Sequence, residues 1–382
     1  MTFIERTTVT GTLRGRALIR KQPSFYTAEQ ALAYLLRVGW AEGDYTAQDI
    51  VEGRFPANLE NLEIIVRRHY ISFANDTTLM HYSAEHYLDI TPEATFKRLV
   101  GERKGGTYCY GHHTLMLGVL RALGYRSYSG IARMNFGFFV GGKEAYQAYG
   151  HMILFVQLGE GQGTDPAHTW IVDCAPGPPC PTLPIPLSDD PTNVLQHSVP
   201  GELNRLTRGF AVASSILPPG PDAQYSPEQA AQVNDAHALW QMEYLPLGKS
   251  EFMVLYQFSE QEFTALDFNV HHYAKMFKPF EDIFSDDVVG ARFALSESAT
   301  DSGLPVTKRS LEKYTLFRGV FKRRLGDKLL EKIVCESEED RVNVLRNYFG
   351  ITIADKDIAH IQKTEARWEK KKATTPETDE LL

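Results

Sequence analysis

The chain has 382 residues, of which 43% are hydrophobic and 23% are charged, so it has the length for two or three globular domains. Its net charge of −8 argues against a general nucleic-acid or membrane-surface binder, which would carry a basic excess. No run approaches the roughly eighteen apolar residues of a membrane span, and residues 1–22 lack the apolar core of a secretory signal.

The cysteines indicate an intracellular protein. The four of them, Cys109, Cys174, Cys180 and Cys335, fit neither a dense disulfide framework nor paired C-x-x-C zinc ligands. Cys174 and Cys180 stand in a Pro-rich segment, and no second pair completes a metal shell. We therefore expect a reducing, cytoplasmic location and no bound metal.

The first third of the chain predicts helices. Thr27, with a glutamine three residues later, gives a capping-box start to a helix over residues 28–38. Apolar residues at helical spacing predict a second helix over residues 59–70. A third helix begins near Cys109, and Gly124 stands where a left-handed C-cap belongs.

After this point the pattern changes from helices to strands. Aromatic and β-branched residues between turn residues predict strands over residues 125–133, 151–158, 169–174 and 251–258. Residues 176–227 are rich in proline and predict an irregular connection, and residues 338–348 predict a short helix. Helices, then strands, then a mixed unit indicate an α+β protein rather than a doubly wound sheet.

Cys109 is the first candidate for chemistry. Gly105 and Gly106 precede it, and it opens a helix with one apolar face. The positive end of the helix dipole and the unpaired backbone N–H groups favour a thiolate there and could stabilise an oxyanion. Taken alone, the pattern fits a buried structural cysteine after a tight turn better than a nucleophile.

His151 and Asp173 change that reading. His151 opens an apolar strand, and Asp173 ends another strand before a turn, positions that are usually structural. A nucleophilic cysteine, however, needs a base, and the base needs an orienting group. The order Cys109, His151, Asp173, with separations of 42 and 22 residues, is that of the transglutaminase-like cysteine enzymes. We therefore interpret the three residues as a catalytic triad.

In more detail, the chain resembles the arylamine N-acetyltransferases over roughly residues 25–362. The resemblance is carried by residues 104–109 (KGGTYC), 151–156 (HMILFV) and 172–177 (VDCAPG), which are similar to that family's R-G-G-x-C, H-M-x-L-x-V and V-D-V-G-F-G. Residues 71–75 (ISFAN) resemble its I-P-F-E-N.

The resemblance implies a three-domain α+β fold. It comprises a helical bundle over residues 1–124, a β-barrel with a Pro-rich insertion over residues 125–245, and an α/β lid over residues 246–362. The charged residues 363–382 would follow as a mobile tail.

The resemblance also implies a ping-pong N-acyltransferase. The Cys109 thiolate would take an acyl group from acetyl-CoA, or from another donor such as malonyl- or propionyl-CoA, and an arylamine or hydrazine would collect it. His151 would hold the thiolate as an ion pair and move protons, while Asp173 would orient the imidazole. Phe73 would contact the acceptor.

Several positions depart from the family pattern. An extra residue precedes Cys109, so that Lys104 replaces the expected arginine, and Ala74 replaces the glutamate that would pair with it. His113 stands where the family has an asparagine near its aspartate, and residues 175–177 (APG) replace G-F-G at the acceptor pocket.

Two alternatives to acyl transfer therefore stay open. One is a CoA-independent cysteine enzyme that forms or cleaves amides in small-molecule biosynthesis. The other is a catalytically silent binding protein on the same scaffold. The natural amine, the preferred donor and the oligomeric state are not indicated by the sequence.

Overall fold

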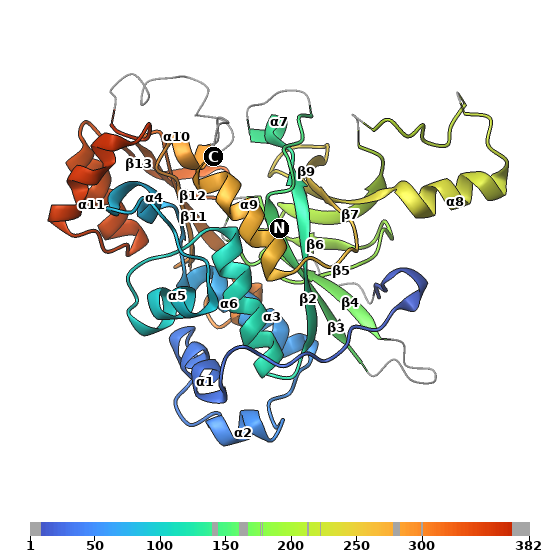
Figure 1. Ribbon diagram of the computed structural model, residues 1–382, viewed down its shortest axis with the longest axis horizontal. Coiled ribbons are helices and arrows are strands. Elements are labelled where there is room, and N and C mark those ends of the chain that lie inside the picture. Colours follow the sequence, from blue (N-terminus) through green and yellow to red (C-terminus); the bar gives the residue numbers. More distant parts are fainter. Residues whose placement is uncertain are drawn as a thin grey trace.

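The structure is a computed structural model that describes residues 9–139, 144–159, 167–175, 177, 179–211, 214–221, 223–277, 283–298 and 301–368. Figure 1 shows three regions: N-terminal helices in blue and cyan, a large sheet in green and yellow, and a smaller sheet with a helix in orange and red.

The N-terminal region contains the predicted helices. Its α-helices are α1 (Ala28–Arg37), α2 (Ala47–Val51), α3 (Leu59–Ser72), α4 (Thr78–Tyr82), α5 (Pro92–Phe96) and α6 (Cys109–Ala122). The capping box at Thr27 is confirmed, because its side chain accepts from Gln30 N and the Gln30 side chain accepts from Thr27 N. Gly124 has φ +91°, as expected after the end of α6. Helix α6 is buried along most of its length and forms the centre of the core.

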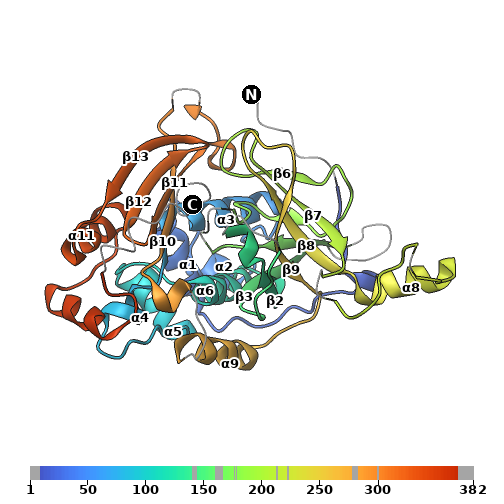
Figure 2. The same cartoon turned by 90° about the horizontal axis from the view of Figure 1, so that it is seen from above.

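The eight-stranded sheet is antiparallel and curves into a nearly closed, barrel-like layer (Figure 2). Its strands are β2 (Arg126–Met134), β3 (His151–Leu158), β4 (His168–Val172), β5 (Ile185–Pro186), β6 (Val194–Gln196), β7 (Leu203–Gly209), β8 (Leu239–Leu245) and β9 (Met253–Phe258). They lie in the order β5-β4-β3-β2-β9-β8-β7-β6. The short helices α7 (Phe136–Phe139) and α8 (Pro227–His237) lie in connections of this sheet.

The irregular connection predicted over residues 176–227 is wrong, because β5, β6 and β7 lie within it. The high proline content of this segment led to the prediction of irregular structure, because proline is rare inside strands. Pro186 stands in β5, which is an edge strand, and an edge tolerates a residue that cannot donate a ladder hydrogen bond. Strand β9 also joins this sheet, although its residues fall within the range that the resemblance assigned to the lid.

The smaller sheet has the order β1-β10-β11-β12-β13. Its strands are β1 (Asn75–Asp76), β10 (Gly290–Leu295), β11 (Leu311–Phe317), β12 (Val320–Leu325) and β13 (Lys328–Val334). Helix α11 (Glu338–Phe349) packs on it through Val342 and Leu345, and Gly350 at φ +67° ends this helix. Helices α9 (Ala265–Met276) and α10 (Ile283–Asp286) precede β10.

Strand β1 joins the helical region to the smaller sheet. Asn75 pairs with Ala291 of β10 on one side and forms a parallel bridge with Thr107 on the other. The backbone N–H of Asp76 donates to Thr107 O over 2.9 Å. The chain just before Cys109 is therefore hydrogen-bonded, through β1, to the edge of the smaller sheet.

Part of the predicted tail is packed. After a 3₁₀ helix at Asp355–Lys363, the Arg341 guanidinium donates to Ala366 O over 2.8 Å, and Trp368 N donates to a Glu338 carboxylate oxygen over 3.2 Å. Residues 369–382 of the predicted tail lie outside the described residues. In the part of the chain that is described, no helix is long and apolar enough to cross a membrane.

Candidate active site

Cys109 is the first residue of α6. Tyr108 is the N-cap residue and has an extended backbone, and its side chain makes no capping hydrogen bond. The Cys109 side chain is mostly buried, and its sulfur lies 3.8 Å from the carbonyl oxygen of Gly150, the residue before β3. The packing of α6 across β2 and β3 thus brings the thiol to the start of the strand that carries His151.

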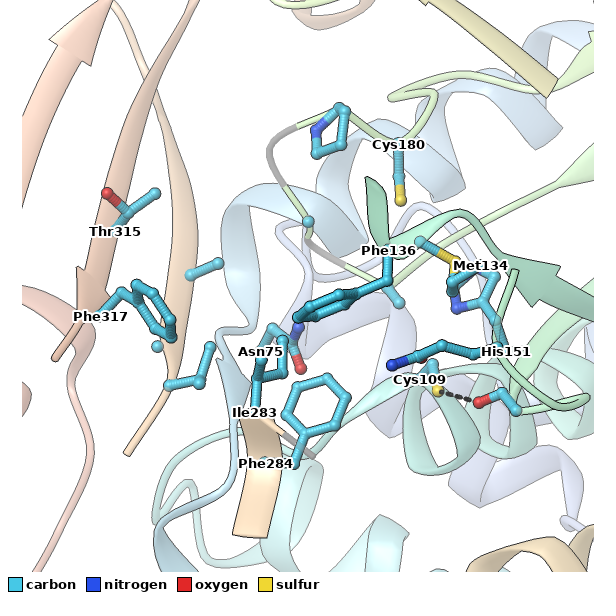
Figure 3. Close-up of a pocket in the computed structure, with 18 of the residues that line it drawn as sticks. Asn75, Cys109, Met134, Phe136, His151, Cys180, Ile283, Phe284, Thr315 and Phe317 are labelled. Carbon is cyan, nitrogen blue, oxygen red and sulfur yellow. Dashed lines mark hydrogen bonds between the residues drawn. The ribbon is translucent and has the colours of Figure 1, made fainter. Parts of the chain in front are cut away.

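His151 and Asp173 meet because β3 and β4 are antiparallel neighbours. His151 is the first residue of β3 and Asp173 directly follows β4, so both lie at the same end of the sheet. His151 Nε2 lies 2.8 Å from Asp173 Oδ2, and both side chains are buried. The structure brings all three predicted triad residues together at the junction of α6 with the eight-stranded sheet, and Figure 3 shows two of them, Cys109 and His151, at the cavity.

The electrostatics favour an imidazolium at His151. Burial alone would lower the pKa of His151, but the Asp173 carboxylate and hydrogen bonds with Asp173 and Cys109 raise it to about 10. Burial would raise the pKa of Asp173, yet the charged His151 holds it well below its ordinary value. Because Nε2 faces Asp173, Nδ1 is the ring atom available to Cys109. The structure therefore places a charged imidazole beside the Cys109 sulfur at neutral pH.

His113 occupies the position of the family's asparagine and braces the site. Its Nδ1 donates to Cys109 O over 2.8 Å, which leaves Nε2 to accept from Cys174 N over 3.0 Å. The same Nε2 lies 3.4 Å from Asp173 Oδ1. One fully buried imidazole therefore connects the first turn of α6 to the residues at the end of β4.

We expect His113→Leu to lower the free energy of unfolding by about 1–3 kcal/mol, because it leaves the buried backbone N–H of Cys174 without its partner. Urea unfolding followed by circular dichroism measures this loss. His237→Leu, a change at an exposed histidine of α8, is the matched control and should alter stability by less than about 0.5 kcal/mol. Equal stability of the two variants would contradict the bracing role.

The expected arginine and its partner are replaced by a different ion pair. Lys104 is exposed and contacts Glu102 instead of the loop core. Arg98, which the sequence analysis did not single out, pairs with Asp76 at 2.8 Å and donates to Gly106 O at 2.7 Å. The Asp76 carboxylate also accepts from Gly106 N. This buried pair holds the glycine turn before Cys109.

The two glycines are needed for that close packing. A Cβ on Gly106 would lie 1.8 Å from Ala74 O, and one on Gly105, at φ +147°, would lie 2.8 Å from the Arg98 guanidinium. The two glycines let the backbone approach Ala74 and the Arg98–Asp76 pair.

A neutral hydrogen-bonded chain lies beneath α6. Tyr34 OH is 3.0 Å from His69 Nδ1, His69 Nε2 is 2.9 Å from His112 Nδ1, and His112 Nε2 is 3.1 Å from Ala74 O. Burial lowers the pKa of His69 well below its ordinary value and that of His112 to about 3, so both rings are uncharged. Ala74 stands where the family has a glutamate. Its backbone carbonyl oxygen is hydrogen-bonded to the uncharged imidazole of His112.

A cavity of about 1270 Å³, part of it open to solvent, lies between the triad and the smaller sheet. Cys109 and His151 line it, and Figure 3 shows aromatic side chains opposite them. The aromatic lining comes from Phe136, Phe284 and Phe317. These residues were not predicted from the sequence, although Phe317 precedes an Arg-Gly pair that indicates a turn between strands.

The structure does not bring Phe73 to this cavity. Phe73 is 1% exposed and packs in the core of the helical region, stacked on Tyr34 and beneath the Arg37 guanidinium. Its position directly after α3 points its ring into that core. The expected contact between Phe73 and an acceptor therefore has no support in the geometry.

The remaining cysteines are reduced, and one of them faces the triad. None of the four cysteines forms a disulfide. Donor atoms of Cys180, His151 and Asp173 lie within 4.8 Å of one another, a spacing that could hold a metal ion. The raised pKa of His151 opposes such binding, because a metal must displace the imidazole proton.

Comparison with known proteins assigns the family. A sequence model of a family described as N-acetyltransferase matches residues 58–358. Solved arylamine N-acetyltransferases share the fold over nearly their whole length. The chain belongs to the arylamine N-acetyltransferase family. It is accordingly an acyltransferase, and the three-domain α+β architecture inferred from the resemblance is that of the family.

The individual structural matches are distant in sequence. The arylamine N-acetyltransferase from Mycobacterium abscessus has a TM-score of 0.62 at 18% identity, covering 89% of this chain and 97% of its own. The Salmonella typhimurium enzyme has a TM-score of 0.61 at 15% identity, covering 88% and 98%. The Mycobacterium marinum enzyme, solved in complex with CoA, has a TM-score of 0.61 at 22% identity, covering 87% and 98%.

At these identities the structural likeness establishes the fold alone. A comparison with curated protein sequences gives no match. The activity of this arylamine N-acetyltransferase family member has therefore to be argued from its own residues.

Proposed function

We propose that the chain transfers an acyl group, acetyl in the simplest case, from a CoA thioester to an arylamine or hydrazine through an S-acyl-Cys109 intermediate. The observation that carries the proposal is the buried Asp173–His151 hydrogen bond beside a cysteine at a helix N-terminus, open to an apolar cavity.

The first half-reaction forms the acyl-enzyme. The Cys109 thiolate attacks the thioester carbonyl, and the positive end of α6 stabilises the oxyanion that develops. The intermediate collapses with expulsion of the CoA thiolate, which takes the proton held by His151. Asp173 keeps the imidazole oriented and favours its charged form throughout.

The second half-reaction uses the same groups in reverse. The neutral amine attacks the S-acyl carbonyl, and His151, now neutral, removes the proton that the nitrogen must lose. The C–S bond breaks, and Cys109 leaves as a thiolate beside the newly formed imidazolium. No group beyond the triad and the two substrates is required for this balance.

The cavity supports both substrate classes. Lys275 and Arg318 are cationic residues of its lining, which suits the phosphates of a CoA donor. The phenyl rings of Phe136, Phe284 and Phe317 suit stacking against a flat aromatic amine. We propose these three phenylalanines, in place of Phe73, as the acceptor contacts.

The proposal predicts an observable covalent intermediate. Purified protein mixed with acetyl-, propionyl- or malonyl-CoA, without amine, should gain the mass of one acyl group, and peptide mapping should locate it on Cys109. Adding an aminophenol should then remove the group and release the amide. Comparing initial rates of acylation ranks the three donors.

Two outcomes would contradict the proposal in different ways. Amide formation or cleavage without a CoA donor, and without acylation by any of the three, would favour the CoA-independent cysteine enzyme. Failure to acylate in folded protein whose Cys109 also resists iodoacetamide would favour the silent binding scaffold.

A further inference from the structure

Helix α9 carries an apolar stripe on its outward face. Leu266, Val270, Tyr273 and Phe277 are 77%, 69%, 65% and 59% exposed. Their successive spacings of four, three and four residues are those of the a and d positions of a coiled-coil seam. Figure 2 shows α9 at the lower edge of the molecule, outside the helices that surround α6.

The four stripe residues are uncharged, and Asn269, Ala274 and the exposed Asp267 flank them. At about 100° per residue, its four members fall within about 60° of arc, and Asn269 and Ala274 lie on either side of them. Lys275 falls on the opposite side of the helix and lines the active-site cavity. A second helix could therefore lie along the four apolar residues, with the Asp267 carboxylate at the margin of the contact.

We propose that two copies of this chain associate through α9, with the two helices antiparallel across a twofold axis between Val270 and Tyr273. An isologous contact places each residue against the same surface of the partner copy, which suits a stripe that carries no charge. The antiparallel orientation also pairs each helix N-terminus with the partner's C-terminus, so that the two dipoles attract.

The exposed area fits a reversible dimer. From usual side-chain sizes, the four residues expose on the order of 600 Å² per copy, compared with about 800 Å² per partner in a standard interface. Tyr87, which stacks on Phe277 and is 39% exposed, extends the patch. An anionic membrane fits less well, because the chain has a net charge of −8 and the stripe has no basic flank.

The inner face of α9 makes this contact relevant to the active site. Phe268 and His272 are buried, and His272 Nδ1 lies 2.6 Å from the hydroxyl group of Tyr108, the residue before Cys109. The proposed partner would thus cover the outer face of a helix whose inner face supports the nucleophile. The inference concerns association and does not depend on the proposed acyl transfer.

Sedimentation velocity of the full chain between about 1 and 100 μM tests the proposal. We expect a concentration-dependent species of twice the chain mass, and Val270→Glu should shift the dissociation constant upward at least tenfold. Val51→Glu, at a 68% exposed valine of α2, is the matched control and should leave the dimer intact. A wild-type monomer at every concentration, or a dimer unaffected by Val270→Glu, would overturn the proposal.

Cross-linking tests the orientation. In the antiparallel pair, Val270→Cys lies close to the axis, and mild oxidation should join two copies through it. Leu266→Cys lies about 16 Å along the helix from its copy and should not react with it. The wild-type chain under the same oxidation controls for its own cysteines. A disulfide dimer formed by Leu266→Cys would overturn the antiparallel arrangement.

Discussion

Cys109→Ala should abolish formation of the acyl-enzyme entirely, because the variant has no nucleophile at the start of α6. The expected result is an unchanged intact mass after incubation with a CoA donor that acylates the wild-type protein. Turnover of an arylamine should fall by at least about 10⁴-fold, as in other enzymes that lose a nucleophile of this kind. Intact-mass spectrometry and a thiol-release assay measure the two effects.

Cys180→Ala is the matched control for this variant. Cys180 lines the same cavity, but burial, together with the nearby Asp173 carboxylate, raises the pKa of its thiol well above the ordinary range. It therefore stays protonated and is a poor nucleophile. We expect Cys180→Ala to acylate at a rate within a few-fold of wild type. Acylation of Cys109→Ala at any other side chain would contradict the assigned role.

Asp173→Asn should lower turnover by about 10³- to 10⁴-fold while leaving the fold intact. The pKa of His151 is raised to about 10 mainly by the Asp173 carboxylate, which outweighs the opposing effect of burial. With that carboxylate removed, burial dominates, and the pKa of His151 should fall below its ordinary value. The imidazole is then neutral at pH 7.5 and no longer stabilises the Cys109 thiolate.

The pH dependence of alkylation reports this change. Because a raised pKa keeps His151 charged below about pH 10, the imidazolium can assist ionisation of Cys109, and the wild-type protein should react readily with iodoacetamide at neutral pH. In Asp173→Asn the rate should instead be low at neutral pH and rise with pH. Asp190→Asn, at an exposed carboxylate, should behave as wild type. A flat profile in Asp173→Asn would refute the orienting role.

The sequence was most informative where local chemistry determines the structure. The capping box at Thr27 and the glycine after α6 each satisfy backbone groups within a few residues, so their outcomes were predictable. The placement of Cys109, His151 and Asp173 followed from their order and their positions at element ends. That they converge depends on the pairing of β3 with β4, which only the resemblance to a family suggested.

Contacts between residues that are distant in the sequence could not be predicted from local sequence patterns. The sequence shows that Lys104 and Ala74 break the family's arginine–glutamate pair, but nothing near them identifies the replacement. Arg98 and Asp76 are 22 residues apart and come together only because β1 lies beside the glycine turn. The location of Phe73 in the helical core rather than at the cavity has a similar cause, because the motif match predicts its position along the chain but not the direction of its ring.

The continuity of hydrogen bonds through β1 has a mechanical consequence. Asn75 and Asp76 bond to β10 on one side and to Thr107 on the other, two residues before the nucleophile. Strand β1 therefore joins the smaller sheet directly to the segment that leads into α6. A displacement of β10 would therefore also strain the segment that precedes Cys109, because both are hydrogen-bonded to the same two residues of β1.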